Sequence, residues 1–408
     1  MDFWNKVRIK GVSGCVKSVK GKVIKLYNSF LFNKYMNLPI DEYSIVLESE
    51  GDCCDNAYAL FDYMKNNGYT KKYRITWLVD YPHNFQDEEN IKYVYKNIYE
   101  HFSKKTIKAL RTCHYYIYDH CNMLTEYKKR DGQKIAYLCH GYAGFKATKG
   151  SSKFSADEEF TTGRIPLQGC IDWHGDVAEK YILGFSRLDY FYNTKIEYTK
   201  LAQRLIEKNN FSKVFLWMPT FRQSDSKELS EDYFENETGL PLFNTIDSMN
   251  SMNEYLKNIN AKIVLKIHHL QSELAIFNRK FSNIQFLRDE DISKCGIQLY
   301  QLIPVFDSLI TDYSSISTDY FLLDKPIIYI LDDIEQYKKS RGLYPENAID
   351  YMPGDHVYII DELKIAIESV LNGVDKFKKA RHELISEFHT YQDGNSSKRI
   401  LKHLGVTI

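Results

Sequence analysis

The stretch of sequence that decides the fold runs from Ile310 to Ile328, ITDYSSISTDYFLLDKPII. An apolar strand, predicted over Ser308–Thr311, leads into a turn of small hydroxyl residues. A helix is predicted over Ser315–Leu323, and a second apolar strand over Pro326–Ile330. Strand, polar turn, helix and strand in this order are typical of a βαβ unit, and such units build parallel sheets. The sequence therefore predicts an α/β protein.

The same alternation extends outward over most of the chain and divides it into two series. A polar loop near a site is predicted at residues 147–163, and a polar insertion at residues 223–239. The simplest architecture is two doubly wound, Rossmann-like domains at residues 42–200 and 201–375, preceded by a basic segment (1–41) and followed by helices (376–408). The other predicted strands are Ser44–Glu48, Arg74–Val79, His114–Tyr118, Lys134–Leu138, Lys213–Trp217, Lys262–Ile267 and Ile284–Leu287.

Composition excludes several classes of protein. The chain has 408 residues, 44% hydrophobic and 26% charged, as in folded globular proteins rather than disordered ones. Lys+Arg and Asp+Glu are both 54, so no overall charge favours nucleic acid. No apolar run approaches the roughly 18–20 residues that span a bilayer, and no signal-peptide pattern is present. The eight cysteines show no CxxC spacing, which favours a reducing, cytoplasmic location over a zinc site or a disulfide framework.

The first 41 residues combine positive charge with a helical apolar stripe. Eight lysines and arginines precede Asp41, with Asp2 as the only acid among them. Val12, Val16, Val19, Val23, Tyr27 and Phe30 recur at helical spacing. Such a basic amphipathic helix is typical of a membrane surface. The alternative is a helix that packs on the protein's own core with a solvated basic back.

A histidine follows the predicted strand Lys134–Leu138. His140 stands beside Gly141, which opens space, and Lys146 comes shortly after. A histidine at the carboxyl end of a strand suits a general base near a bound phosphate. The alternative is a histidine that merely caps a turn.

Three further strand ends carry side chains that bind phosphate. Taken singly, each has an ordinary explanation: a surface ion pair, a solvated edge or a helix N-cap. Ligands of doubly wound sheets bind outside the carboxyl ends of strands, so four such ends together favour one phosphate-binding site. The residues at these three ends are Thr220, Arg222, Lys266, His268, Thr311, Asp312, Ser314, Ser315 and Asp319.

These segments resemble those of the CDP-glycerol glycerophosphotransferase family, which includes the teichoic acid primases and polymerases. Ile310–Ile328 resembles the family signature, and the ordered set of similar segments spans residues 140–354. The others are His140-Gly141 with a later lysine (similar to WHG…K), Gly184–Asp189 (GxPRxD), Met218–Arg222 (PT(Y/F/W)R), Leu265–His268 (LR-x-H), Asp333–Leu343 and Met352–Gly354.

The resemblance implies a GT-B fold, with two Rossmann-like domains facing a central cleft and the nucleotide bound mainly by the second. It implies transfer of glycerol phosphate or ribitol phosphate from a CDP-linked donor to a hydroxyl of a lipid-linked or polymer acceptor, with release of CMP. His140 would match the base and His268 a second essential histidine near the phosphates. No metal site is expected, although loosely held Mg²⁺ stays open. The matching donor-binding positions are Arg187, Arg222, Lys266, Ser314, Ser315 and Asp319.

The sequence departs from the family pattern beside His140. Cys139 replaces the usual Trp, and Trp173-His174-Gly175 matches the WHG letters better. His140 is preferred because an apolar strand precedes it and lysines follow it. Two other functions stay open: a GT-B enzyme that moves a sugar from a nucleotide sugar in capsule synthesis, and a catalytically silent binding module. An enzyme of the implied kind would lie peripherally on the inner face of a bacterial membrane.

Overall fold

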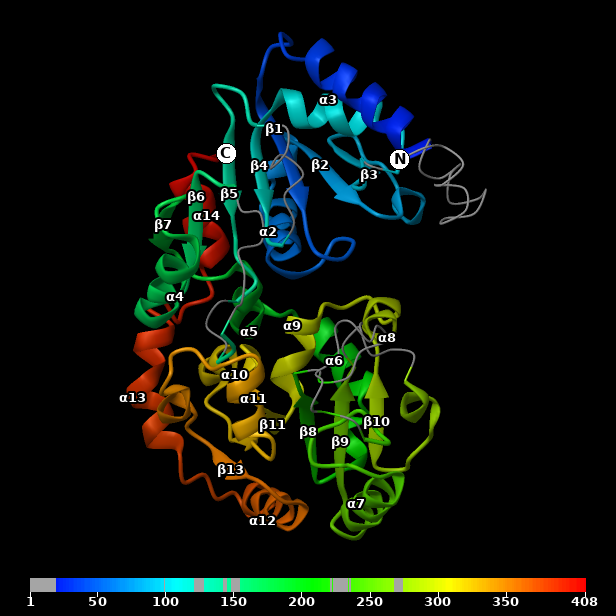
Figure 1. The fold of residues 1–408 in the computed structure, drawn as a ribbon, viewed down its shortest axis with the longest axis vertical. Helices are drawn as coiled ribbons and strands as arrows, with labels where there is room; N and C mark the ends of the chain where they lie inside the picture. Colours follow the sequence, from blue (N-terminus) through cyan, green and yellow to red (C-terminus); the bar gives the residue numbers. More distant parts are fainter. Residues whose placement is uncertain are drawn as a thin grey trace, which may run out of the picture.

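Two parallel β-sheets, one in each lobe of the molecule, organise the chain (Figure 1). The computed structural model describes residues 20–98, 100–120, 128–141, 145–147, 155–220, 222, 234, 236–267 and 274–408. Helices cover the sheets, and two hydrophobic core clusters lie in each lobe. The predicted α/β class with two doubly wound domains is therefore confirmed.

The sheet of the N-terminal lobe has the strand order β3-β2-β1-β4-β5-β6-β7, and its neighbouring strands are parallel. The order reverses between β1 and β4, which makes the carboxyl ends of these strands the usual place for a ligand. The strands are β1 (Asp41–Glu48), β2 (Arg74–Val79), β3 (Ile91–Tyr95), β4 (Cys113–Tyr118), β5 (Lys134–Tyr137), β6 (Glu158–Thr161) and β7 (Glu179–Ile182).

The sheet of the C-terminal lobe repeats this plan with the order β10-β9-β8-β11-β12-β13, again with parallel neighbours. Its order reverses between β8 and β11, so the turn of residues 311–315, which follows β11, lies where doubly wound sheets bind ligands. The strands are β8 (Lys213–Met218), β9 (Ala261–Lys266), β10 (Ile284–Leu287), β11 (Ser308–Thr311), β12 (Ile327–Ile330) and β13 (Asp355–Val357).

Most helices connect successive strands on either face of the sheets (Figure 1). They are α2 (Asp55–Asn66), α3 (Lys104–Thr112), α4 (Arg164–His174), α5 (Tyr190–Asn193), α6 (Ile196–Leu205), α7 (Ile246–Asn258), α8 (Asp289–Lys294), α9 (Leu299–Leu302), α10 (Ile316–Tyr320), α11 (Ile334–Ser340), α12 (Ile360–Leu371), α13 (Lys378–Phe388) and α14 (Ser396–His403).

The chain crosses between the lobes more than once. Helix α6 spans the boundary predicted near residue 200, and its Ala202 is buried in a core cluster of the C-terminal lobe. At the other end, Ile400 and Leu401 of α14 are buried in the core of the N-terminal lobe. Helix α13 runs along the side of the molecule between these contacts (Figure 1). The predicted domain limits stay a prediction, and the C-terminal helices join the two lobes.

One local prediction is wrong. The stretch 147–163, predicted as a polar loop, contains strand β6, although residues 148–154 lie outside the described residues. The strand looks polar in the sequence because it begins with Glu158 and Glu159. Glu159 is fully buried, however, and lies 2.9 Å from the Nδ1 of His174 and 3.8 Å from the Nζ of Lys180. Partners distant in sequence neutralise the carboxylate, so the strand forms despite its polar letters.

Residues 20–34 are helical and lie along the outer face of the N-terminal lobe (Figure 1). Ile24, Leu31 and Phe32 pack inward and are at most 3% exposed. The stripe predicted from the sequence continues on another face, where Val23 is 50% and Phe30 is 60% exposed. The alternative of packing on the protein's own core therefore describes one face of this helix only. Val12, Val16 and Val19 lie outside the described residues.

Candidate active site

The predicted base, His140, follows β5 on a sharply turned backbone. Cys139 has φ +58° and Gly141 has φ +127°. The side-chain amide of Asn56 donates to the Cys139 carbonyl at 2.6 Å, and Arg187 Nη1 donates to the His140 carbonyl at 2.8 Å. Two side chains from other elements therefore fix this turn, and with it the Cα of the histidine.

The His140 imidazole is partly buried and lies against two other aromatic side chains. Its Nδ1 is 3.3 Å from the Tyr137 hydroxyl, and its ring centroid is 4.6 Å from that of His120. Burial, with His120 adding to it and Asp55 opposing it, lowers the pKa of His140 to about 4. The ring is therefore neutral near pH 7 and able to accept a proton. An anionic ligand beside it would raise the pKa and make it a stronger base.

The turn that follows β11 supplies the opposite side of the site. The backbone carbonyls of Ser314 and Ser315 accept hydrogen bonds from the amides of Ser317 and Thr318, both at 3.2 Å, and so begin α10. Ser314 and Ser315 are partly exposed. Within the described residues, their hydroxyl groups make no hydrogen bond and are free to meet a ligand.

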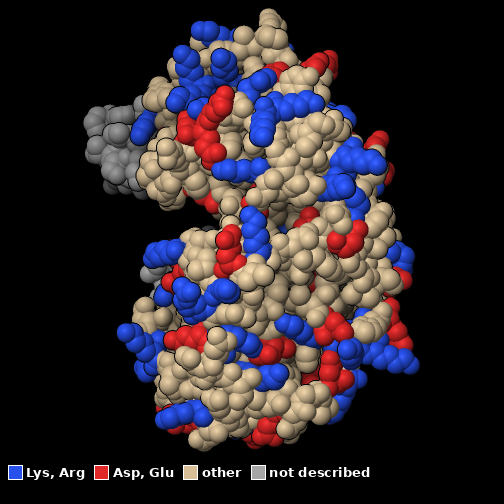
Figure 2. Space-filling view, turned by 180° about the vertical axis from the view of Figure 1, so that it is seen from behind, with Lys and Arg blue, Asp and Glu red and all other residues tan. Residues whose placement is uncertain are grey.

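The His140 turn and the Ser315 turn face each other across the two lobes. A Cβ placed on Gly141 would lie 3.0 Å from Ser315 Oγ and 3.2 Å from Ser315 Cβ. The segment after His140 continues onto the C-terminal lobe, where the Phe145 amide donates to the Tyr313 carbonyl at 3.1 Å. Figure 2 shows the molecule hollowed between its lobes. Two strand ends that the sequence predicts separately are thus brought together.

Four predicted donor-binding side chains are buried instead. Thr311, Asp312 and Arg222 are 0% exposed and Thr220 is 5% exposed. Asp312 accepts from the Thr220 amide at 2.9 Å and from Arg222 Nη1 at 2.8 Å. Thr311 Oγ1 donates to the Met218 carbonyl at 2.8 Å. These contacts hold the ends of β8 and β11 together. Direct donor contact by these four residues stays a prediction.

Arg222 is anchored from a second direction. Its Nε donates to Asp333 Oδ2 at 2.6 Å, and its guanidinium lies 5.1 and 4.8 Å from the ring centroids of Tyr313 and Tyr337, which stack on each other. The carboxylates of Asp312 and Asp333 hold its pKa well above the usual range despite burial. Arg222 would have to exchange one of these carboxylates in order to bind an incoming phosphate.

Arg187 and Asp319 bind each other across the lobes, and their predicted contact with the donor stays a prediction. Both are 3% exposed. Arg187 Nη2 donates to Asp319 Oδ2 at 2.9 Å, and Arg187 Nη1 donates to Asp55 Oδ1 at 2.7 Å. The Tyr300 hydroxyl donates to the same Asp319 oxygen at 2.6 Å. This arginine joins residues of both lobes directly behind the His140 turn.

Two lysines differ in how far they are neutralised. Lys146 is partly exposed and has no ion pair among the described residues; burial lowers its pKa, against the opposing effect of Asp312. Such a cation gains most from a phosphate ligand. Lys266 is 8% exposed, and its Nζ lies 2.9 Å from both Asp289 Oδ1 and the Ile267 carbonyl. Lys266 would have to exchange these partners in order to bind a donor.

The other two candidate histidines, His174 and His268, differ from His140 in what the structure shows of them. His174 is 8% exposed, its Nδ1 lies 2.9 Å from Glu159 Oε1, and its ring centroid is 6.1 Å from that of Tyr137. The choice of His140 over His174 stays a prediction. His268 lies outside the described residues, and its predicted role stays a prediction. Residues that the sequence analysis missed include Asp55, His120 and Tyr300. Asp55 opens α2, the helix that follows β1, and His120 comes two residues after β4. The strand order reverses between β1 and β4, and that position was the signal that could have found both residues.

Within the described ranges, no group of three or more His, Cys, Asp or Glu residues is arranged to hold a metal ion. No helix in the same part of the chain is long and apolar enough to cross a membrane.

Two Rossmann-like lobes whose strand ends face each other over a shared site define a GT-B protein. The sequence matches the family described as CDP-Glycerol:Poly(glycerophosphate) glycerophosphotransferase over residues 30–161 and 173–405, and the chain belongs to this family. Solved structures of the wall teichoic acid polymerase TagF share the fold. One aligns with a TM-score of 0.71 at 19% identity, over 96% of this chain and 97% of the other. A TagF variant soaked with CDPG gives 0.70 at 18% identity, over 100% and 98% of the two chains.

The curated relatives include enzymes named for glycerol phosphate and enzymes named for ribitol phosphate. A teichoic acid glycerol-phosphate primase of Bacillus spizizenii is 28% identical over 196 residues, 47% of this chain and 43% of the relative. A teichoic acid ribitol-phosphate primase of the same organism is 30% identical over 55% of this chain and 53% of the relative. These alignments span about half the length of the relatives. A teichoic acid poly(glycerol phosphate) polymerase of that organism is 24% identical over 95% of this chain and 100% of the relative.

Proposed function

We propose that the chain transfers glycerol phosphate or ribitol phosphate from a CDP-linked donor to a hydroxyl of a lipid-linked or polymer acceptor, in the synthesis of a teichoic acid or a capsule-like polymer. Family membership supports this reaction class. The observation that carries the site is the apposition of Gly141 and Ser315, since it puts a neutral imidazole and two free hydroxyls at one interface.

In the proposed reaction, the acceptor oxygen forms a bond to the distal phosphorus of the donor. The bond from that phosphorus to the bridging oxygen breaks, and CMP leaves with the electron pair. His140 accepts the hydroxyl proton, a contribution of typically ~10²–10⁴-fold. Ser314, Ser315 and Lys146 hold the diphosphate, and Lys266 and His268 add positive charge near the phosphoryl oxygens. Thr220, Arg222, Thr311 and Asp312 keep the turn in place.

The direct test is CMP release by the purified full chain with CDP-glycerol or CDP-ribitol and a lipid-linked acceptor analogue. His140→Ala should lose ~10²–10⁴-fold in kcat. His114→Gln is the matched control, because His114 lies near the amino end of β4, at the edge of the sheet opposite the site, and should keep wild-type turnover. Full activity in His140→Ala would refute the assignment of the base. Turnover with a nucleotide sugar in place of the CDP-polyols would favour the sugar-transferase alternative. Binding of the donor without any turnover would favour the catalytically silent binding module.

We also propose that the helix at residues 20–34 holds the enzyme on the inner face of the membrane, where a lipid-linked acceptor would lie. Leu26 is 72% and Phe30 is 60% exposed, although both are apolar. Lys20, Lys22 and Lys25 are exposed on the same helix. Lys and Arg side chains gather at this end of the molecule in Figure 2. Exposed apolar residues framed by cations favour an anionic lipid surface.

Flotation with anionic liposomes tests this attachment. Leu26→Ser/Phe30→Ser should lower the membrane-bound fraction. The matched control is Ile365→Ser/Val374→Ser, because these residues of the C-terminal lobe are 63% and 45% exposed but lie outside the helix. Equal flotation of both variants would contradict the role of the helix.

A further inference from the structure

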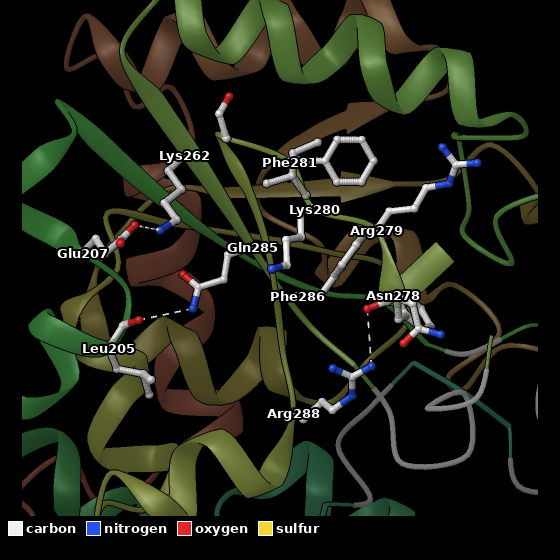
Figure 3. Close-up of a pocket in the computed structure, with 13 residues that line it drawn as sticks. Leu205, Glu207, Lys262, Asn278, Arg279, Lys280, Phe281, Gln285, Phe286 and Arg288 are labelled. Atoms are coloured by element: carbon white, nitrogen blue, oxygen red, sulfur yellow. Dashed lines mark hydrogen bonds and ion pairs between the residues drawn. The ribbon is translucent and has the colours of Figure 1, made fainter. Parts of the chain in front are cut away.

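A groove runs along β10, the outer strand of the C-terminal sheet, away from the candidate active site. Its volume is about 510 Å³. Strand β9 separates β10 from β8, so the groove lies two strands away from the β8–β11 switch point. Its residues come from β10, from the end of α6 and from residues 277–282 (Figure 3). This β10 groove is distinct from the place expected for the donor.

Positive charge dominates the β10 groove. Lys262, Arg279, Lys280 and Arg288 line it, with Glu207 as the single carboxylate. Glu207 lies 2.6 Å from the Lys262 ammonium and neutralises it. Arg279 and Lys280 are exposed, and no ion pair within the described residues involves either. Three cations are therefore left to attract an anion.

The walls of the β10 groove suit a flexible carbon chain with repeated charges. Four strand residues, Ile284–Leu287, extend over about 13 Å at the usual rise of about 3.3 Å per residue. Phe281 and Phe286 supply apolar surface, and the Gln285 amide supplies a polar contact. In Figure 3, Lys280 and Gln285 approach each other near the middle of the groove, while Arg288 lies at one end.

One end of the groove leads toward the candidate active site. Arg288 follows the last residue of β10, and that residue, Leu287, pairs with Lys266 in the sheet. The next residue, Asp289, lies 2.9 Å from the Lys266 ammonium. Lys266 is one of the predicted phosphate-binding residues, so a linear ligand along β10 would reach the carboxyl edge of the sheet, where transfer is proposed.

We propose that the β10 groove binds a linear polyol-phosphate chain, the polymeric acceptor or product, through Arg279, Lys280 and Arg288. This inference rests on the proposed function. Arg279 and Lys280 precede β10 and Arg288 follows it, and cations distributed in this way beside a strand match a ligand with a phosphate on every repeat better than they match one diphosphate. Binding would hold a growing chain near the site between successive additions.

Fluorescence anisotropy of an end-labelled synthetic oligo(glycerol phosphate) tests the groove with the full chain. Arg279→Gln/Lys280→Gln should weaken binding of the oligomer by about tenfold and reduce its salt dependence. The dissociation constant for CDP-glycerol should not change. Lys398→Gln/Lys402→Gln is the matched control, because it removes the same charge from exposed positions on α14. Oligomer binding in the groove variant equal to that of the control would overturn the proposal.

Turnover separates this inference from the proposed function. With an acceptor of many units, the groove variant should raise KM and leave kcat unchanged; with a single-unit acceptor neither should change. If the wild type turns over CDP-polyols but the groove variant behaves like the control, the groove fails and the function stands. If no CDP-polyol is turned over and the groove variant still loses oligomer binding, the function fails and the groove stands.

Discussion

Replacing Gly141 by alanine perturbs the contact between the lobes with a single methyl group. The new Cβ would lie 3.0 Å from Ser315 Oγ, 3.2 Å from Ser315 Cβ and 3.5 Å from Arg187 Nη2. The first two distances are shorter than ordinary van der Waals contact, so the Ser315 turn must move away. The backbone at φ +127° adds strain of about 1–3 kcal/mol for a residue with a Cβ. The required movement is a few tenths of an ångström. Since a displacement of about 1 Å between reacting groups costs roughly 10²-fold in rate, we expect a loss of roughly tenfold at most.

Gly296→Ala is the matched control for backbone strain. Gly296 also has a positive φ, +76°, but a Cβ there would meet no atom within 4 Å. Both variants should lose about 1–3 kcal/mol of unfolding free energy in urea titrations. Only Gly141→Ala should lose kcat for CMP release, by severalfold up to roughly tenfold. Equal kcat values for the two variants would refute the claim that His140 and Ser315 act across this contact.

Three further outcomes are expected. Arg187→Met leaves Asp319 and Asp55 without their buried cation and should lower the unfolding free energy by about 3–5 kcal/mol in urea titrations; a loss below about 1 kcal/mol would contradict the interlobe ion pair. Because the pKa of His140 is about 4 in the fold and ordinarily 6.5, the unfolded chain takes up a proton first, so stability should fall as the pH drops from 6.5 to 4. Urea titrations across this range should show a smaller fall for His140→Gln, and identical slopes would contradict the buried neutral imidazole. His174→Gln should lower the unfolding free energy by about 1–3 kcal/mol and leave kcat unchanged. A large loss of kcat would contradict this prediction and make His174 a candidate for the base.

The sequence predicts where site residues lie along the chain better than where their side chains point. His140, Ser314 and Ser315 follow predicted strands and lie at the candidate site, because the carboxyl ends of parallel strands share one edge. Arg222 also follows a predicted strand, yet Asp333 binds it from 111 residues away. Local spacing carries no information about such a partner. A buried structural arginine and one that binds phosphate therefore look the same in the sequence.

Arg187 shows the same limit across the lobes. Its carboxylate partners, Asp55 and Asp319, are each 132 residues away, one on each side along the chain. Only the packing of both lobes brings the three together. Strand β6 was missed for a related reason, because Glu159 reads as a loop residue and its partners His174 and Lys180 are not adjacent in sequence. Period and turn residues located nine of the thirteen strands that the structure describes, and β3, β7 and β13 were missed as well as β6.

The most direct measurement of the central claim is a structure of the full chain with a CDP-linked polyol bound. The diphosphate should lie within hydrogen-bonding distance of the Ser314 and Ser315 hydroxyls and of the Lys146 ammonium, with the His140 imidazole on the opposite side of the distal phosphorus. A donor bound elsewhere, or an imidazole facing away from the phosphorus, would contradict it.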